Sequence, residues 1–231
     1  MCASSPAAEV RGMFDRIAGR YDRANRIMSA GVDVLWRRKA IRALLAGLGS
    51  VSSALDLGAG TLDGALAIRR LRPQARVCAA DFARNMLVAG RGKPGAGEVA
   101  AQVADAHAMP YRDGVFDVAF SAFCVRNLRD PAVAMVELRR VVRSGGRVVI
   151  LEFFRPGRPR LFWDGLYNTR LLPLIGGAVT GDPSAYRYLP ESIARFLARH
   201  EFEALLRSVG FARVTGRDLF PGGVASMVVA E

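Results

Sequence analysis

The chain has few of the residues that bind metals, form disulfides or build catalytic triads. Three cysteines and two histidines occur in 231 residues. Cys2, Cys78 and Cys124 lack metal-ligand spacing, and three thiols cannot all pair, which indicates a reducing, cytoplasmic setting. Because His107 and His200 stand alone, the sequence predicts neither a metal site nor a Ser-His triad.

Long hydrophobic runs are missing as well. The most apolar stretch of the second half, 171–179, is interrupted by Pro173 and glycines. It falls well short of the roughly 20 residues that span a bilayer. Residues 1–13 lack the apolar core of a secretory signal, and we expect them to be frayed. Hydrophobic residues still make up 51% of the chain, which is enough for a sizeable core.

Charge is strongly unbalanced toward cations, with a formal net charge of +12. Such a surface favours nucleic acid or anionic lipid headgroups, although a coding bias toward arginine gives the same count. The arginines are scattered and rarely interleaved with aromatics, which argues against a nucleic-acid platform. Arg155, Arg158 and Arg160 gather near Trp163, a combination suited to a membrane interface. Ordinary core packing is the alternative for Trp163.

The chain does contain a glycine loop between a short apolar run, 54–57, and a helix-forming segment, 62–71. Gly58 and Gly60 permit a tight turn and leave room for a ligand against the backbone. A second apolar run ends at Asp81, about 20 residues later, where a doubly wound sheet places the acid that binds a ribose diol. We therefore expect an adenosine ligand. The alternative is that the glycines only turn a strand into a helix.

The residues after the loop discriminate between adenosine cofactors. The third glycine of a dinucleotide fingerprint and the Gly-Lys-Ser/Thr of a Walker loop are both absent. Asp63 stands where a pyrophosphate would approach. A carboxylate there repels phosphates but suits the sulfonium or amino group of S-adenosylmethionine, which we predict as the cofactor.

Acidic residues follow a series of expected strands, at Asp56, Asp81 and Asp105. Strand ends of an open α/β sheet meet at one rim, where ligands bind. We expect Asp105 to face the adenine amino group, with Ala106 offering its backbone N–H. The alternative interpretation of Asp105 is the N-cap of a short helix.

Several segments carry a family resemblance. They are 14–22 (FDRIAGRYD) with Asn25, Ser29 and Trp36, 125–128 (VRNL), 140–147 (RVVRSGGR), 151–153 (LEF), 172–176 (LPLIG), 186–189 (YRYL) with Glu191 and Ser192, 210–211 (GF) and 222–224 (GGV). Together they resemble the ubiquinone/menaquinone-biosynthesis C-methyltransferases over nearly the whole chain. The chain departs from that pattern with Leu62 and Val125 for glycines, Asp33 for a histidine, and a C-terminus without the usual histidine and aromatic end.

The resemblance implies an α/β, class I Rossmann-like methyltransferase fold with a mixed seven-stranded sheet whose last strand is antiparallel. We expect a single domain, 1–231, made of a helical lid (1–50), a cofactor-binding core (51–154), a substrate-cap insertion (155–200) and a closing helix and hairpin (201–231). Expected strands lie near 53–57, 76–80, 99–104, 115–122, 147–153, 212–219 and 224–230. Expected helices lie near 33–48, 62–71, 84–91, 131–142 and 201–209.

The resemblance also implies an activity, the S-adenosylmethionine-dependent C-methylation of a polyprenyl quinol such as demethylmenaquinol. The open alternatives are another small phenolic or aliphatic acceptor, an RNA target favoured only by charge, and a non-catalytic scaffold in a quinone-synthesis assembly. We expect a cytoplasmic protein that contacts an anionic membrane surface peripherally; a homodimer stays open.

Residues with expected roles fall into three groups. Those expected at the cofactor are Asp56, Gly58, Gly60, Thr61, Asp63, Asp81, Phe82, Asp105, Ala106 and Ser121. Those expected in catalysis are Arg126, Asn127 and Tyr21. Those expected at the substrate are Tyr188 and Trp163.

Quinol chemistry explains the catalytic group. A ring carbon is a weak nucleophile until a neighbouring hydroxyl loses its proton. Arg126 can stabilise the phenolate, or orient a water that collects the ring proton, but its guanidinium is a poor base. A surface salt bridge is the alternative interpretation of Arg126. Asn127 can hold a quinol oxygen, and Tyr21 can close over the pocket. Cys124 is a nucleophile in one interpretation and a buried apolar cysteine in the favoured one.

Overall fold

The structure is a computed structural model that describes residues 6–157, 182–220 and 224–231. Its strands are β1 (Ser53–Leu57), β2 (Arg76–Asp81), β3 (Val99–Val103), β4 (Phe116–Ala122), β5 (Val142–Glu152), β6 (Val214–Asp218) and β7 (Ser226–Ala230). Its α-helices are α1 (Pro6–Ile17), α2 (Tyr21–Met28), α3 (Val32–Leu45), α4 (Asp63–Leu71), α5 (Arg84–Gly90), α6 (Pro131–Val141), α8 (Pro183–Arg195) and α9 (Arg199–Ser208). Short 3-10 turns are η1 (Ala18–Arg20), η2 (Ala96–Glu98) and η3 (Val125–Asn127).

The described strands form one seven-stranded sheet in the order β3-β2-β1-β4-β5-β7-β6. The pairs from β3 to β5 are parallel, whereas β7 runs antiparallel to both of its neighbours. This arrangement confirms the predicted fold class. The strand order reverses between β1 and β4, and the crevice at such a reversal is where open α/β sheets bind ligands.

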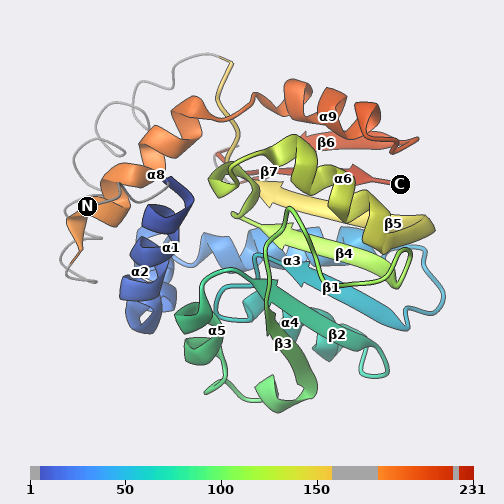
Figure 1. Cartoon of the computed structure of the whole chain (residues 1–231), viewed down its shortest axis with the longest axis horizontal. Helices are drawn as coiled ribbons and strands as arrows, with labels where there is room; N and C mark the ends of the chain where they lie inside the picture. The colour runs from blue at the N-terminus through green and yellow to red at the C-terminus, as the bar shows by residue number, and fades with distance from the viewer. Residues whose placement is uncertain (1–5, 158–181, 221–223) are drawn as a thin grey trace.

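Helices cover both faces of the sheet (Figure 1). On one face, α3, α4 and α5 share a hydrophobic core with residues of the central strands, including Ile41, Ile68 and Val118. On the other face, α6 and α9 bury residues such as Leu138 and Phe202 against the sheet. All five residues of β1 are buried, as expected for a central parallel strand covered on both sides.

Every strand expected from the sequence is present, and the largest displacement is in β5. This strand begins at Val142, whereas the sequence predicted a start near 147. Val142 pairs with Phe116, and pairing then resumes between Arg147 and Val118. The residues between form an irregularity that includes Gly145 at φ +71°. A glycine turn inside a paired segment is therefore what displaced the predicted boundary.

The N-terminal residues correct one expectation. We predicted that residues 1–13 are frayed, but α1 begins at Pro6. Met13 and Ile17, one helical turn apart, are buried with Ala24 of α2, and Tyr188 and Leu189 of α8 pack against them. Helices α1, α2 and α8 lie together at one end of the molecule (Figure 1). The local sequence does not predict this helix, because its stability comes from packing its apolar side against α2 and α8.

The predicted substrate-cap insertion, 155–200, is described only in part. Arg155 donates its backbone N–H to the Leu197 carbonyl at 3.0 Å, which joins the two ends of the insertion. Helix α8 lies within it, whereas Trp163, Arg158 and Arg160 lie outside the described residues. Among the helices that the structure describes, none has the length and apolar content to cross a bilayer.

Candidate functional site

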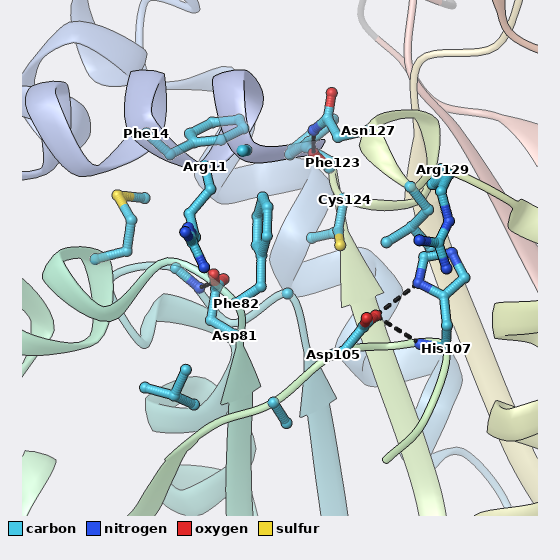
Figure 2. A pocket seen from close by; sticks show the side chains of 18 of the residues that line it. Arg11, Phe14, Asp81, Phe82, Asp105, His107, Phe123, Cys124, Asn127 and Arg129 are labelled. Carbon is cyan, nitrogen blue, oxygen red and sulfur yellow. Dashed lines mark hydrogen bonds and ion pairs between the residues drawn. The ribbon is translucent and has the colours of Figure 1, made fainter. Parts of the chain in front are cut away.

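A cavity of about 430 Å³ lies at the carboxyl ends of β1, β2 and β4, a volume in the range of small-molecule sites. Its walls come from the glycine loop, the strand ends, the N-terminal helices and the segment after β4 (Figure 2). Expected site residues that line it are Tyr21, Gly58, Gly60, Asp81, Phe82, Asp105 and Asn127. Expected site residues that are described but do not line it are Asp56, Thr61, Asp63, Ala106, Ser121, Arg126 and Tyr188.

The glycine loop forms the floor of this cavity. Gly58 and Gly60 adopt φ values of +68° and +51°, which side chains other than glycine rarely tolerate. A Cβ on Gly58 would overlap the side chain of Cys124, which comes from the end of β4. The first glycine is therefore required both by the turn and by a close approach between two strand ends.

Leu62 stands where the resembled family has glycine, and it keeps a glycine-like backbone. Its φ is +69°, and its side chain is fully buried among the residues that pack α3 and α4 against the sheet. The left-handed conformation costs roughly 1–2 kcal/mol, whereas burying a leucine contributes about 1.5–3 kcal/mol. The departure therefore preserves the turn.

Asp81 ends β2 at the cavity wall. Its Oδ2 accepts the Gly60 N–H at 2.8 Å, and its Oδ1 accepts the Ala83 N–H at 2.8 Å. Burial raises the pKa of Asp81, and these backbone hydrogen bonds oppose the rise. Each carboxylate oxygen has further acceptor capacity, so the group can receive the two hydroxyls of a ribose.

Asp56 lies beneath the loop and not in the cavity wall. It is 2% exposed, and its Oδ2 accepts the Ala65 N–H in the first turn of α4 at 2.6 Å. A Cβ on Gly64 would lie 2.6 Å from the same oxygen, so the carboxylate sits tightly under the helix start. Burial raises the pKa of Asp56 to about 7. The structure thus gives Asp56 the role of supporting α4.

This raised pKa predicts a pH-dependent stability. Folding favours the protonated carboxyl, because its pKa of about 7 in the folded chain exceeds the ordinary 3.8. The free energy of unfolding therefore falls as pH rises from about 4 to about 7, by up to about 4 kcal/mol. Asp56→Asn keeps the oxygen for Ala65 and removes the titration. Chemical denaturation at each pH is expected to show the variant gaining on the wild type across this window; parallel curves would contradict the assignment.

Asp63 corrects a second expectation, because it does not face the cavity. Its Oδ1 accepts from Lys93 Nζ at 2.5 Å, and its Oδ2 accepts from Arg26 at 2.7 Å and Arg37 at 3.4 Å. Burial alone would raise the pKa of Asp63, but Lys93 and these arginines outweigh it and hold the pKa below the ordinary value. The cations that Asp63 binds are thus the protein's own side chains, where we had predicted the sulfonium or amino group of the cofactor.

Thr61 belongs to the same polar network. Its Oγ1 donates to Asp22 of α2 at 2.5 Å and accepts from Lys93 Nζ at 3.0 Å. Lys93 also pairs with Asp22 at 2.6 Å. The network ties α2 to the glycine loop. Asp33, the other departure from the family pattern, is buried beside it and pairs with Arg26 and Arg37.

Asp105 lines the cavity, and it does not cap a helix as the alternative interpretation had it. Its Oδ1 accepts from the backbone N–H of His107 at 2.9 Å and lies 2.6 Å from His107 Nδ1, so it caps a turn and not a helix (Figure 2). Its carboxylate is 61% exposed and lines the cavity. His107 Nε2 in turn accepts the Asp130 N–H at 3.1 Å, which fixes the start of α6. Ala106 is buried behind this turn.

Arg126 forms a buried ion pair, where the alternative interpretation had placed a surface one. Its Nη1 lies 2.6 Å from Glu152 Oε1, and the two side chains are 7% and 0% exposed. The same nitrogen donates to the Phe123 carbonyl at 2.9 Å, and the guanidinium lies over the Phe153 ring at 5.6 Å. Its Nε is buried without a partner among the described residues. Glu152 and the Phe123 carbonyl thus both accept from the same guanidinium nitrogen.

Asn127 and Tyr21 line the next part of the wall, and Tyr188 contacts Asn127 from outside it. Tyr188 donates its hydroxyl to Asn127 Oδ1 at 3.1 Å, and Asn127 Nδ2 donates to the Phe123 carbonyl at 3.2 Å. Phe123 has φ +57°, a strained conformation that turns its carbonyl toward both Arg126 and Asn127. Burial raises the pKa of Tyr21, which therefore stays a phenol near neutral pH. The expected catalytic residues and Tyr188 thus lie in one neighbourhood.

Cys124 lines the cavity beside Gly58, and Ser121 is buried earlier in β4. Burial strongly raises the pKa of the Cys124 thiol, which disfavours a thiolate nucleophile. This agrees with the favoured interpretation of an apolar cysteine.

The sequence interpretation missed several cavity residues. Arg11, Phe14, His107 and Arg129 line the cavity. Figure 2 shows Arg11 reaching from α1 toward Asp81. The signal for Phe14 was its place in the N-terminal motif. Arg11 had no such signal, because the helix that carries it was expected to be frayed.

Solved structures share the fold of this chain. A Thermotoga maritima SAM-dependent methyltransferase, described as a possible histamine N-methyltransferase, superposes with a TM-score of 0.66 at 17% identity, covering 95% of this chain and 98% of that one. Haemonchus contortus phosphoethanolamine N-methyltransferase 2, solved in complex with S-adenosyl-L-methionine, gives 0.61 at 15% identity, covering 84% and 51%. At these identities the likeness concerns the fold.

Sequence comparison is more specific. The ubiquinone/menaquinone biosynthesis C-methyltransferase UbiE of Syntrophotalea carbinolica is 41% identical over 228 residues, covering 96% of this chain and 93% of that protein. The demethylmenaquinone methyltransferase of Thermus thermophilus is 41% identical over 224 residues, covering 95% and 99%. The family model described as ubiE/COQ5 methyltransferase matches residues 3–230. The chain is therefore a methyltransferase that belongs to the ubiE/COQ5 methyltransferase family.

Proposed function

We propose that the chain transfers a methyl group from S-adenosylmethionine to a ring carbon of a polyprenyl quinol, with demethylmenaquinol as the preferred acceptor. The observation that carries this proposal is a single cavity with two kinds of lining. Gly58, Gly60 and Asp81 form a first wall suited to an adenosine, and Tyr21 and Asn127 form a second wall that can hydrogen-bond to a phenol. The names of the relatives from Syntrophotalea and Thermus support the acceptor class.

The residues of the first wall fit the proposed cofactor. Asp81 would receive the ribose hydroxyls, the glycine loop would lie against the methionine part, and the exposed Asp105 carboxylate would accept from the adenine amino group. Phe82, next to Asp81 in the wall, would pack on the adenosine. When bound, the cofactor supplies an activated methyl on a sulfonium. The chain must then align the nucleophile and exclude water, which can supply roughly 7–11 kcal/mol.

The second wall would activate the acceptor. Arg126 lies behind this wall, and its positive charge would stabilise the phenolate, while Asn127 in the wall would hold a quinol oxygen. Tyr188 fixes the Asn127 side chain by its hydroxyl. Tyr21, a half-buried phenol that keeps its proton, would close the pocket as a hydrogen-bond donor. Because a guanidinium keeps its proton, the ring proton would leave to a water that Arg126 orients.

The test is direct. Purified protein is incubated with S-adenosylmethionine and chemically reduced demethylmenaquinone, and the mass of the quinone product is measured by mass spectrometry. We expect the gain of one methyl group on the ring. Quinones from cells that lack the protein should show the matching unmethylated species. The proposed acceptor would be overturned if the purified protein added no methyl group and the cells that lack it still made the methylated quinone.

A further inference from the structure

We propose that the exposed side of α3, together with Phe220, is a docking surface for an anionic lipid bilayer. This surface consists of Leu35, Arg38, Lys39, Arg42 and Phe220, and we call it the α3 face. The inference rests on the proposed function, because a polyprenyl quinol resides in a membrane and must be collected there.

Exposed apolar side chains mark this surface. Phe220 is 78% exposed and Leu35 is 49% exposed. The adjoining Leu219 is buried in the same core as Trp36 of α3, so the chain after β6 packs on the helix and turns Phe220 outward. Lys39 Nζ donates to the Phe220 carbonyl at 3.4 Å, which places the aromatic residue beside the helix. An exposed Phe and Leu on one rigid surface suit insertion among headgroups.

The charges on this surface have one sign. The exposed side of α3 presents, in order, Leu35, Arg38, Lys39 and Arg42. The acid within α3, Asp33, is buried. The nearby Asp218 is already paired with Arg199. The described part of the α3 face therefore presents cations without a competing carboxylate, which complements an anionic bilayer.

Phe220 and the start of α3 lie at the same end of the strands as the cavity. Phe220 follows β6, whose last residue, Asp218, pairs through Ser226 with Glu152 at the end of β5. This is the edge of the sheet that carries Arg126 and the cavity. The first turns of α3 lie at the same edge, because Arg37 reaches Asp63 beside the glycine loop. Docking by the α3 face would thus bring the substrate side of the molecule to the lipid.

The experiment measures partition of the full chain onto vesicles of phosphatidylglycerol and phosphatidylcholine in equal parts. Each interfacial cation contributes about fivefold, so the triple variant Arg38→Gln, Lys39→Gln, Arg42→Gln is expected to bind about a hundredfold more weakly. Phe220→Ser is expected to lose about tenfold. Turnover of a short-tailed quinol in solution should be unchanged in both, whereas turnover of a long-tailed quinol in vesicles should fall with binding.

A matched triple variant removes the same charge from the opposite edge of the sheet, Arg70→Gln, Arg76→Gln, Arg112→Gln. We expect it to stay within threefold of the wild type, as should Val136→Ser on the exposed side of α6. Equal losses in both triple variants, no vesicle binding by the wild type, or loss of single-stranded RNA binding in place of vesicle binding would each overturn the proposal. Vesicle binding without turnover of the soluble quinol would overturn the proposed function but would still support docking by the α3 face.

Discussion

Arg126→Met is expected to lower turnover about 10²–10³-fold, the usual effect of removing a group that stabilises a developing oxyanion. The same change leaves Glu152 fully buried without its cation. An uncompensated buried charge costs about 3–5 kcal/mol, so the variant should also unfold at a lower denaturant concentration. Turnover and unfolding are measured on the same preparation.

A double variant separates these two effects. Adding Glu152→Gln to Arg126→Met removes the buried charge, so stability should largely return while turnover stays low. Recovery of turnover would instead mean that Arg126 only supports the fold. Arg143→Met is the matched control, since it breaks an exposed ion pair with Asp117. That loss is expected to be under about 1 kcal/mol, with turnover unchanged.

Gly58→Ala is expected to weaken S-adenosylmethionine binding at least a hundredfold, as measured by calorimetry. The new Cβ would overlap Cys124 Sγ and Cβ, and the residue would have to keep φ +68°. Relieving the overlap would move the loop or the end of β4, and both line the cavity. We expect a loss of about 2–4 kcal/mol in stability as well.

Cys124→Gly should partly rescue that variant. It removes both overlapping atoms and leaves the Cys124 Cα 3.8 Å from the new methyl group. The deficit that remains relative to Cys124→Gly alone would measure the strain at positive φ. Gly97→Ala is the control, because its added methyl meets nothing within 4 Å. A Gly58→Ala protein that binds the cofactor normally would show that this loop is not part of the cofactor site.

Local sequence patterns were sufficient for the sheet and for part of the site. Short apolar runs predicted β1 and β2, and the acid after the second run correctly placed Asp81 in the cavity wall. The partners of Asp63 were beyond such reasoning, because Arg26, Arg37 and Lys93 come from segments far apart in the chain. Spacing shows where a carboxylate stands on a strand or helix. It does not show which cations the fold brings to it.

Leu62 illustrates the same limit in the opposite direction. A motif comparison counts it as a lost glycine, whereas the structure shows the left-handed backbone retained and the side chain used in the core. The fold requires a positive φ at this position and a side chain, or a neighbouring group, that fills the space beneath it. Leucine meets both requirements here, so the missing glycine does not mean that the turn is lost.

The ion pair between Arg126 and Glu152 has a consequence for the proposed reaction. Because the pair is neutral as a unit, a bound phenolate and sulfonium would add two charges of opposite sign to the pocket. Methyl transfer cancels both at once. Exclusion of water by the bound ligands would destabilise these charged reactants more than the neutral products, and this difference would favour the transfer.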